Sequence, residues 1–293
     1  MFLSVHVLRR DAIAIHTAMH YTTPMKTSVI LTGLLILFCT ACSPITMERN
    51  VVYGVADGQK LVLDIYHPMG MTGLRPALLF VHGGGWAAGS KETFGDAPAN
   101  MAKQGYVTFA INYRLIQNGK NLWPAQLDDV QRAIRWIRAH ATDYHVDPER
   151  IGAIGHSAGG HLVACLATRE TRDNADPTLS AYSSRVTCAV DMSGPVDLTV
   201  SDNPQADGII AALLGGKNTE KPALARDASP LFFVDAMTAP VLIIHGRCDT
   251  LVAVRHAEQF DAALRRAGIE TQALIFPDEG HGLTKKENTA RMI

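Results

Sequence analysis

Short apolar runs alternate with helical patterns from residue 51 onward, and no other feature restricts the possible folds as strongly. Runs typical of strands occupy 61–66, 77–81, 107–112, 151–155, 186–192, 241–245 and 272–276. Their apolar residues are continuous, as in strands that are covered on both faces. The sequence therefore predicts an α/β fold, in which helices cover both faces of a mostly parallel sheet.

Three other segments add detail to this pattern. Residues 51–53 and 61–66 are close in the chain and are expected to form an antiparallel hairpin at the sheet edge. Residues 195–235 are rich in Asp, Pro, Gly and Asn, which predicts an irregular lid or substrate-binding excursion. A helix is expected to begin at Pro124, with a solvated face formed by arginines at helical spacing: Arg132, Arg135 and Arg138.

Residues 25–42 have the features of a targeting signal. A basic start after Met25, an apolar core over 29–38 and small residues before Cys42 are typical of a secretory signal. The apolar core is too short for a stable membrane anchor. This interpretation divides the chain into an upstream extension from a misplaced start (1–24), a signal peptide (25–42), a linker (43–50) and one domain (51–293).

Cys42 follows Ala41 in an arrangement that resembles a bacterial lipobox, in which the cysteine after the cut becomes lipidated. Cys39 departs from the motif, because leucine or valine usually stands there. We expect an exported protein that is attached to a membrane of the bacterial cell envelope through Cys42, with a soluble periplasmic or secreted form as the alternative. The cysteines of the domain are expected to be buried as small hydrophobes, with one disulfide as the alternative in an exported protein: Cys165, Cys188 and Cys248.

Charge and cysteine spacing exclude several kinds of partner. The formal net charge of −1 provides no basic field for nucleic acid. The sequence contains no CxxC pair and no His/Cys cluster at metal-binding spacing. A metal site is therefore not expected.

The run GHSAG at 155–159 lies between a predicted strand and a helical pattern. A strand-to-helix turn of this kind holds its serine in a strained conformation, with the hydroxyl exposed at the carboxyl end of the sheet. Ser157 is therefore the candidate nucleophile. The pentapeptide alone is a weak signal, and the strand before it and the helix after it make it a strong one.

A serine nucleophile needs a base, and the base needs an orienting carboxylate. Asp249 follows the predicted strand 241–245 and His281 follows 272–276, which gives the order Ser, Asp, His along the chain. Asp197 and Asp278 remain as alternative acids. The other histidines near these motifs are expected at a packed strand end (His245), on a helix surface (His256) and in the pocket lining (His156).

Three glycines separate His82 from Trp86 directly after the strand 77–81. Attack by a serine on a carbonyl creates an oxyanion that backbone N–H groups must meet at about 3 Å, and side chains there would shield those groups. The expected donors are Gly84, Gly85 and Ala158, with Gly83 as a close alternative. A phosphate-binding loop is the competing hypothesis, but it requires a helix directly after the glycines, where Trp86 stands.

The sequence resembles the α/β-hydrolase superfamily, in particular the hormone-sensitive-lipase-like and BD-FAE-like esterases. The resemblance covers residues 51–293 and rests on "HGGGW", "NYRL", "DPERIGAIGHSAGGHLVA", "HGRCDTLV" and "DEGHG". It implies an eight-stranded α/β-hydrolase fold and cofactor-free ester hydrolysis through an acyl-enzyme. Ala253 stands where these enzymes often have proline. They also carry a helix after the histidine, and we expect that helix to be truncated in this chain, which ends at Ile293.

The expected function is that of a serine carboxylesterase acting on small acyl or acetyl esters, with a small-molecule ester as its partner. Two alternatives remain. The "DEGHG" segment also resembles serine peptidases and amidases of the acylaminoacyl-peptidase type. The second alternative is a non-catalytic binding module on the same scaffold, because a fold does not ensure a function.

Lipidation of Cys42 can be tested by fractionation of cells that express the intact chain. The parent protein should partition with membranes, and Cys42→Ser should be released or accumulate as precursor, because lipid attachment requires the thiol. A soluble parent protein that begins at an unmodified Ser43 would contradict the hypothesis.

Overall fold

The computed structural model describes residues 44–70, 72–172, 176–285 and 287–288. The predicted upstream extension, signal peptide and Cys42 lie outside these residues, as do residues 289–293 of the predicted C-terminal helix. In the described part of the chain, no helix has the length and apolar character that crossing a bilayer requires.

The described residues form an eight-stranded sheet with the order β1-β2-β4-β3-β5-β6-β7-β8. The strands are β1 (Ile45–Ala56), β2 (Gln59–Pro68), β3 (Arg75–Val81), β4 (Val107–Ile111), β5 (Val146–His156), β6 (Cys188–Met192), β7 (Val241–Gly246) and β8 (Thr271–Phe276). The pairs β1–β2 and β2–β4 are antiparallel, and the pairs from β4 to β8 are parallel. This confirms the mostly parallel sheet and its antiparallel edge hairpin.

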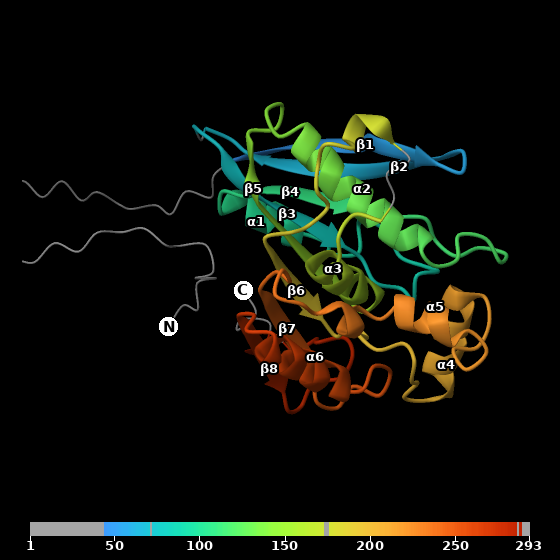
Figure 1. Ribbon diagram of the computed structural model, residues 1–293. Helices are drawn as coiled ribbons and strands as arrows, with labels where there is room; N and C mark the ends of the chain where they lie inside the picture. The colour runs from blue at the N-terminus through green and yellow to red at the C-terminus, as the bar shows by residue number, and fades with distance from the viewer. Residues whose placement is uncertain (1–43, 71, 173–175, 286, 289–293) are drawn as a thin grey trace, which may run out of the picture.

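Helices cover both faces of the sheet (Figure 1). They are α1 (Ala97–Lys103), α2 (Ala125–Ala139), α3 (Ala158–Thr168), α4 (Pro204–Leu214), α5 (Pro222–Asp227) and α6 (Arg255–Arg266), with short 3-10 helices η2 (Pro177–Leu179) and η3 (Pro230–Phe233). On one face, α2, α3 and α6 contribute to the main core. On the other, α1 packs on β4, where the hydroxyl of Thr108 donates to the carbonyl of Pro98.

The two-residue period of β4 shows how its sequence serves both faces. Val107, Phe109 and Ile111 are buried in the main core. Thr108 and Ala110, which alternate with them, are also buried and face the side of α1. A strand that is covered on both faces needs small or apolar residues at every position, which explains the continuous apolar run.

Two predicted boundaries are wrong. The expected linker 43–50 is largely strand, because β1 begins at Ile45, which pairs with Pro68 of β2. The expected irregular excursion 195–235 contains α4, α5 and η3. Asn203 caps α4 by accepting the N–H of Ala206, so the polar residues that suggested a loop begin a helix instead.

The prediction of a solvated arginine face on α2 is also wrong. Arg132 and Arg135 are buried and Arg138 is half-buried. Arg132 donates to the carbonyl of Val55 in β1. The other two donate to carbonyls of the segment 176–187: Leu179 and Tyr182 from Arg135, and Ser183 and Arg185 from Arg138. These arginines therefore attach β1 and a long connection to α2.

The described cysteines Cys165, Cys188 and Cys248 are free thiols. Cys165 is buried, as predicted, and burial raises its pKa to about 12. Cys188 is partly buried. Cys248 is exposed, which contradicts the prediction, because it lies in the turn that leaves β7 instead of within the strand.

Candidate active site

Four parallel strands, β3 and β5 together with β7 and β8, bring the candidate residues to one edge of the sheet. Val81 at the end of β3 pairs with Gly155 near the end of β5, and Gly246 at the end of β7 pairs with Phe276 at the end of β8. All these strands are parallel, so the turns that follow them lie along the same edge. These turns carry the three glycines, Ser157, Asp249 and His281.

Ser157 is the single residue between β5 and α3, and its backbone is held at φ 56°, ψ −120°. A residue with a side chain rarely adopts this conformation, which costs of order 1–3 kcal/mol. A Cβ on Gly155 would lie 2.2 Å from the carbonyl oxygen of Gly159, and a Cβ on Gly159 would lie 1.9 Å from that of Val81. Only glycine fits at both positions, so the GxSxG pattern is a steric requirement of the turn.

Ser157, His281 and Asp249 form a continuous hydrogen-bonded chain. The Nε2 of His281 lies 2.9 Å from the Oγ of Ser157, and its Nδ1 lies 2.7 Å from the Oδ2 of Asp249. A carboxylate only accepts, so Nδ1 carries the proton and the Nε2 lone pair faces the serine hydroxyl. This tautomer can withdraw a proton from Ser157.

Asp249 is held by both of its carboxylate oxygens. Its Oδ1 accepts the N–H groups of Leu251 and Val252, both at 2.9 Å. Burial would raise the pKa of Asp249, but hydrogen bonds from His245 and His281 outweigh it and hold that pKa well below its usual range. The carboxylate therefore stays ionised behind the imidazole.

The alternative acids lie elsewhere. Asp197 forms a local turn in which it accepts the N–H and hydroxyl of Thr199. Asp278 is exposed and pairs with the ammonium group of Lys285. Neither carboxylate bonds to His281, whose Nδ1 is bonded to Asp249.

Two of the other histidines differ from expectation. His156 is not among the cavity-lining residues; its Nε2 donates to the backbone carbonyl of His281 at 2.8 Å. His256 is buried in the first turn of α6 instead of exposed, and its Nε2 lies 3.1 Å from the Oδ2 of Asp202. His245 is packed at the end of β7, as predicted, but it also contacts Asp249, which the sequence analysis missed.

The glycine loop, residues 83–85, is held in place by His82 and by backbone hydrogen bonds. His82 is buried, stacks on the ring of Tyr113 at 4.3 Å and donates from Nδ1 to the carbonyl of Gly83 at 2.7 Å. The carbonyl of Gly84 accepts the N–H groups of Ala87 and Ala88. Gly84 has φ +114°, and a Cβ there would lie 2.3 Å from the carbonyl oxygen of Ala88.

Gly83 and Gly85 lie against the site itself. A Cβ on Gly83 would lie 3.2 Å from the Cβ of Ser157. Gly85, with φ +59°, faces the side chain of Ile209 on α4 and lines the cavity beside Ser157. The loop and α4 therefore meet at the nucleophile.

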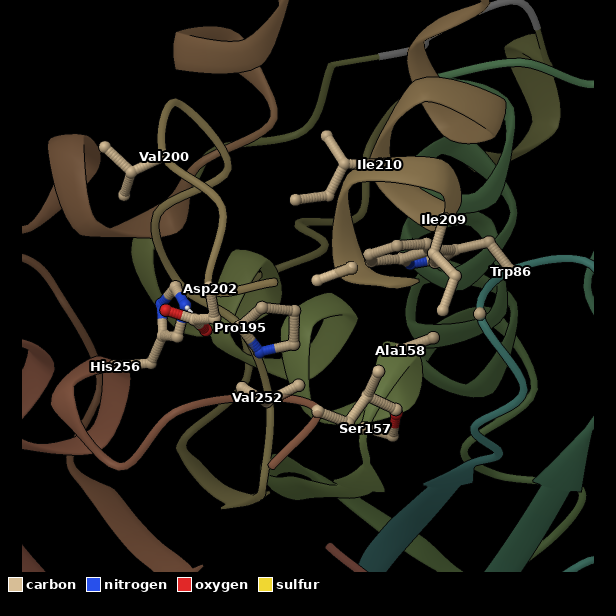
Figure 2. A pocket seen from close by; sticks show the side chains of 13 residues that line it. Trp86, Ser157, Ala158, Pro195, Val200, Asp202, Ile209, Ile210, Val252 and His256 are labelled. Carbon is tan, nitrogen blue, oxygen red and sulfur yellow. Dashed lines mark hydrogen bonds and ion pairs between the residues drawn. The ribbon is translucent and has the colours of Figure 1, made fainter. Parts of the chain in front are cut away.

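A small apolar cavity of about 60 Å³ opens beside Ser157 (Figure 2). Figure 2 shows Trp86 and Ile209 on one side of it and the Asp202–His256 pair on another. It is lined by Gly85, Trp86, Ser157, Ala158, Pro195, Val200, Asp202, Ala206, Ile209, Ile210, Leu251, Val252 and His256. The predicted excursion 195–235 thus supplies much of the wall.

The segment before α4 is tied to the loop that carries Asp249. Asp202 accepts from the N–H of Ala253 and the Nε of Arg255, besides the Nε2 of His256. The side-chain amide of Asn203 donates to the carbonyls of Thr250 and Leu251.

Among the described residues, no group of His, Cys, Asp or Glu side chains is arranged to hold a metal ion.

Comparison with known proteins places this site in a family. Residues 63–264 match the family model described as BD-FAE. The chain belongs to the BD-FAE family. A relative in Mycobacterium tuberculosis, the probable carboxylic ester hydrolase LipM, is 32% identical over 79% of this chain and 54% of its own length. Esterase LipC of the same organism is also 32% identical, over 80% of this chain and 59% of its own. The chain thus spans about half the length of the curated relatives it matches.

Solved structures agree with this BD-FAE assignment and with the α/β-hydrolase fold. A truncated carbohydrate esterase from gut microbiota has a TM-score of 0.73 and 28% identity, over 84% of this chain and 93% of that one. The esterase Est2 of Thermogutta terrifontis, solved with butyrate bound, has a TM-score of 0.71 and 27% identity, over 86% and 90% of the two chains.

Two substitutions separate the candidate acids. Asp249→Asn should lower kcat for a p-nitrophenyl ester by about 10⁴-fold, because an amide at this place favours the wrong tautomer of His281. Asp278→Asn removes an exposed ion pair with Lys285 and should change kcat less than about threefold. The reverse ranking of the two variants would move the orienting role to Asp278.

Proposed function

We propose that this protein is a serine carboxylesterase that hydrolyses esters of short acyl groups. The observation that carries the proposal is the hydrogen-bonded chain from Asp249 through His281 to Ser157, together with the small apolar cavity beside Ser157. The names of its relatives support the same reaction class: LipM and LipC are described as a carboxylic ester hydrolase and an esterase.

Each residue of the chain has a role in this mechanism. The Oγ of Ser157 attacks the ester carbonyl carbon while the Nε2 of His281 takes the hydroxyl proton, and Asp249 stabilises the resulting imidazolium. Collapse of the tetrahedral intermediate breaks the bond to the alcohol oxygen, which leaves with the proton from His281. Water then attacks the acyl-enzyme with His281 again as base, which releases the acid and restores Ser157.

Backbone geometry supports Gly84 and Gly85 as oxyanion donors. In a trans peptide the C=O and the following N–H point in opposite directions. The carbonyls of Gly83 and Gly84 are bonded within the protein, to His82 and to the turn at 87–88. The N–H groups of Gly84 and Gly85 therefore point away from these partners. Ala158, the first residue of α3, would supply the third donor from the helix N-terminus.

The cavity volume favours short acyl groups. A water-sized group occupies about 10–15 Å³ on this scale, so about 60 Å³ admits roughly four to six such groups. The apolar wall of Trp86, Ile209 and Ile210 suits a hydrocarbon chain. Est2, whose structures hold butyrate and propionate, is a neighbour with short acids bound.

The first test is a panel of p-nitrophenyl esters from acetyl to decanoyl beside an aminoacyl p-nitroanilide. The parent protein should prefer acyl groups of up to about six carbons, since longer chains exceed the cavity. Ser157→Ala should lose about 10⁶-fold in kcat and should not be labelled by a fluorophosphonate. Preference for the anilide would favour the amidase hypothesis, and a folded but inactive, unlabelled parent would favour the binding module.

A second test addresses the wall of the cavity. Ile209→Ala should raise kcat/KM for octanoyl relative to butyryl esters by about tenfold, because it removes apolar atoms next to Gly85. Ile269, which is half-buried in the turn between α6 and β8, provides the matched control: Ile269→Ala should leave the ratio unchanged. An unchanged ratio in Ile209→Ala would place the acyl chain elsewhere.

A further inference from the structure

A second histidine contacts the carboxylate that orients the base. The Nε2 of His245 lies 3.3 Å from the Oδ2 of Asp249 and 2.8 Å from the carbonyl oxygen of Val252. The side chains of His245 and Asp249 are 1% and 0% exposed. Both oxygens lack protons, so Nε2 carries the hydrogen, which it donates to the carbonyl of Val252 while it lies beside the carboxylate of Asp249.

The hydrogen bonds to Asp249 account for its whole accepting capacity. A carboxylate offers about four lone-pair sites. Backbone N–H groups of Leu251 and Val252 fill two of them at Oδ1, His281 fills a third at Oδ2, and the N–H of His245 is the group beside the fourth, at 3.3 Å. Without His245, one buried site on the oxygen that faces His281 would lose its donor, which is costly in an apolar interior.

We propose that His245 is a positioning residue of this esterase: by donating to Oδ2, it fixes the rotation of the Asp249 carboxylate and shares its negative charge with His281. This inference rests on the proposed function, because it assigns His245 an effect on the base. His245 acts through Asp249 and takes no part in bond making.

Charged and titratable groups face His245 from three neighbouring elements. Asp249 follows β7 itself, Asp191 stands on β6, and His156 stands at the end of β5. Burial alone would lower the pKa of His245, but the hydrogen bonds to Asp249 and Val252, together with both carboxylates, outweigh it and raise that pKa. Burial raises the pKa of Asp191 to about 7, so Asp191 is only partly ionised at neutral pH, whereas Asp249, with its lowered pKa, is fully ionised beside His245.

The charge sharing fixes the direction of a pH effect. A carboxylate that keeps more of its negative charge for His281 favours the protonated imidazole, which cannot act as base. Loss of His245 should therefore extend the protonated form to higher pH. The acidic limb of kcat/KM, which reports the base in the free enzyme, should move to higher pH.

The test compares His245→Leu, which removes the donor, with His245→Gln, whose amide can reach the place of Nε2. Rates are measured with p-nitrophenyl butyrate and normalised to the Ser157 sites that a fluorophosphonate labels. His245→Leu should lower plateau kcat by about tenfold with KM nearly unchanged, and move the acidic limb up by about half a pH unit or more. His245→Gln should recover kcat to within about threefold of the parent, because it restores the donor.

His161 provides a matched control. It is fully buried and its Nε2 donates to the carbonyl of Ala228 at 2.6 Å, so it bonds to a backbone carbonyl in place of a carboxylate. His161→Gln should leave the acidic limb where it is. If His245→Leu does not fold, His245→Asn is used as the donor-free variant, because its shorter amide cannot reach the carboxylate of Asp249.

The outcomes separate this inference from the proposed function. Profiles that superimpose for the parent and the donor-free variant would overturn the inference, as would a loss of kcat that His245→Gln does not recover. A parent protein that a fluorophosphonate does not label would instead contradict the proposed function. A downfield shift of the proton resonance between His281 and Asp249 in the donor-free variant would support the inference independently.

Discussion

The approach of the Ser157 turn to β3 is the constraint on which the rest of the site depends. Gly159 lies so close to the carbonyl of Val81 that no side chain fits between them. This contact brings the end of β5 against the end of β3, so that the nucleophile and the glycine loop share one small space. Because interiors are close-packed, the turn has no room to relax, and the surrounding sheet holds Ser157 in its positive-φ conformation.

Around this fixed point, hydrogen bonds from the backbone and from buried histidines orient the reacting groups. His82 holds the glycine loop, His156 holds the backbone of His281, and His245 contacts Asp249. Each histidine donates to an oxygen that has no proton of its own. The site is therefore built with its dipoles already oriented, the arrangement that most reduces reorganisation during a reaction.

The sheet and the hydrogen-bonded chain were predictable because both follow from local patterns. Continuous apolar runs identify strands covered on both faces, and the order of parallel strands places Ser157, Asp249 and His281 at one edge. The contact between His245 and Asp249 was not predictable, because it depends on how the turn after β7 folds back on the strand. The same is true of the Asp202–His256 pair, whose members lie 54 positions apart.

The prediction of a solvated arginine face on α2 was wrong for a related reason. Helical periodicity reports which face of α2 meets the sheet. It does not report that the connection 176–187 passes beside α2, where the carbonyls of that connection accept hydrogen bonds from Arg135 and Arg138. Long polar side chains can be buried wherever irregular backbone needs donors.

The clamp of Asp202 and Asn203 on the loop after Asp249 has an evolutionary consequence. The same short segment that precedes α4, and so shapes the cavity beside Ser157, also fixes the loop that holds Asp249. Substitutions in this segment that widen or narrow the cavity will also alter the position of Asp249, and through it the orientation of His281. Under the proposed function, substrate range and turnover are therefore mechanically linked. A lineage that exchanges the segment for another acyl preference must also rebuild the contacts of the acid loop.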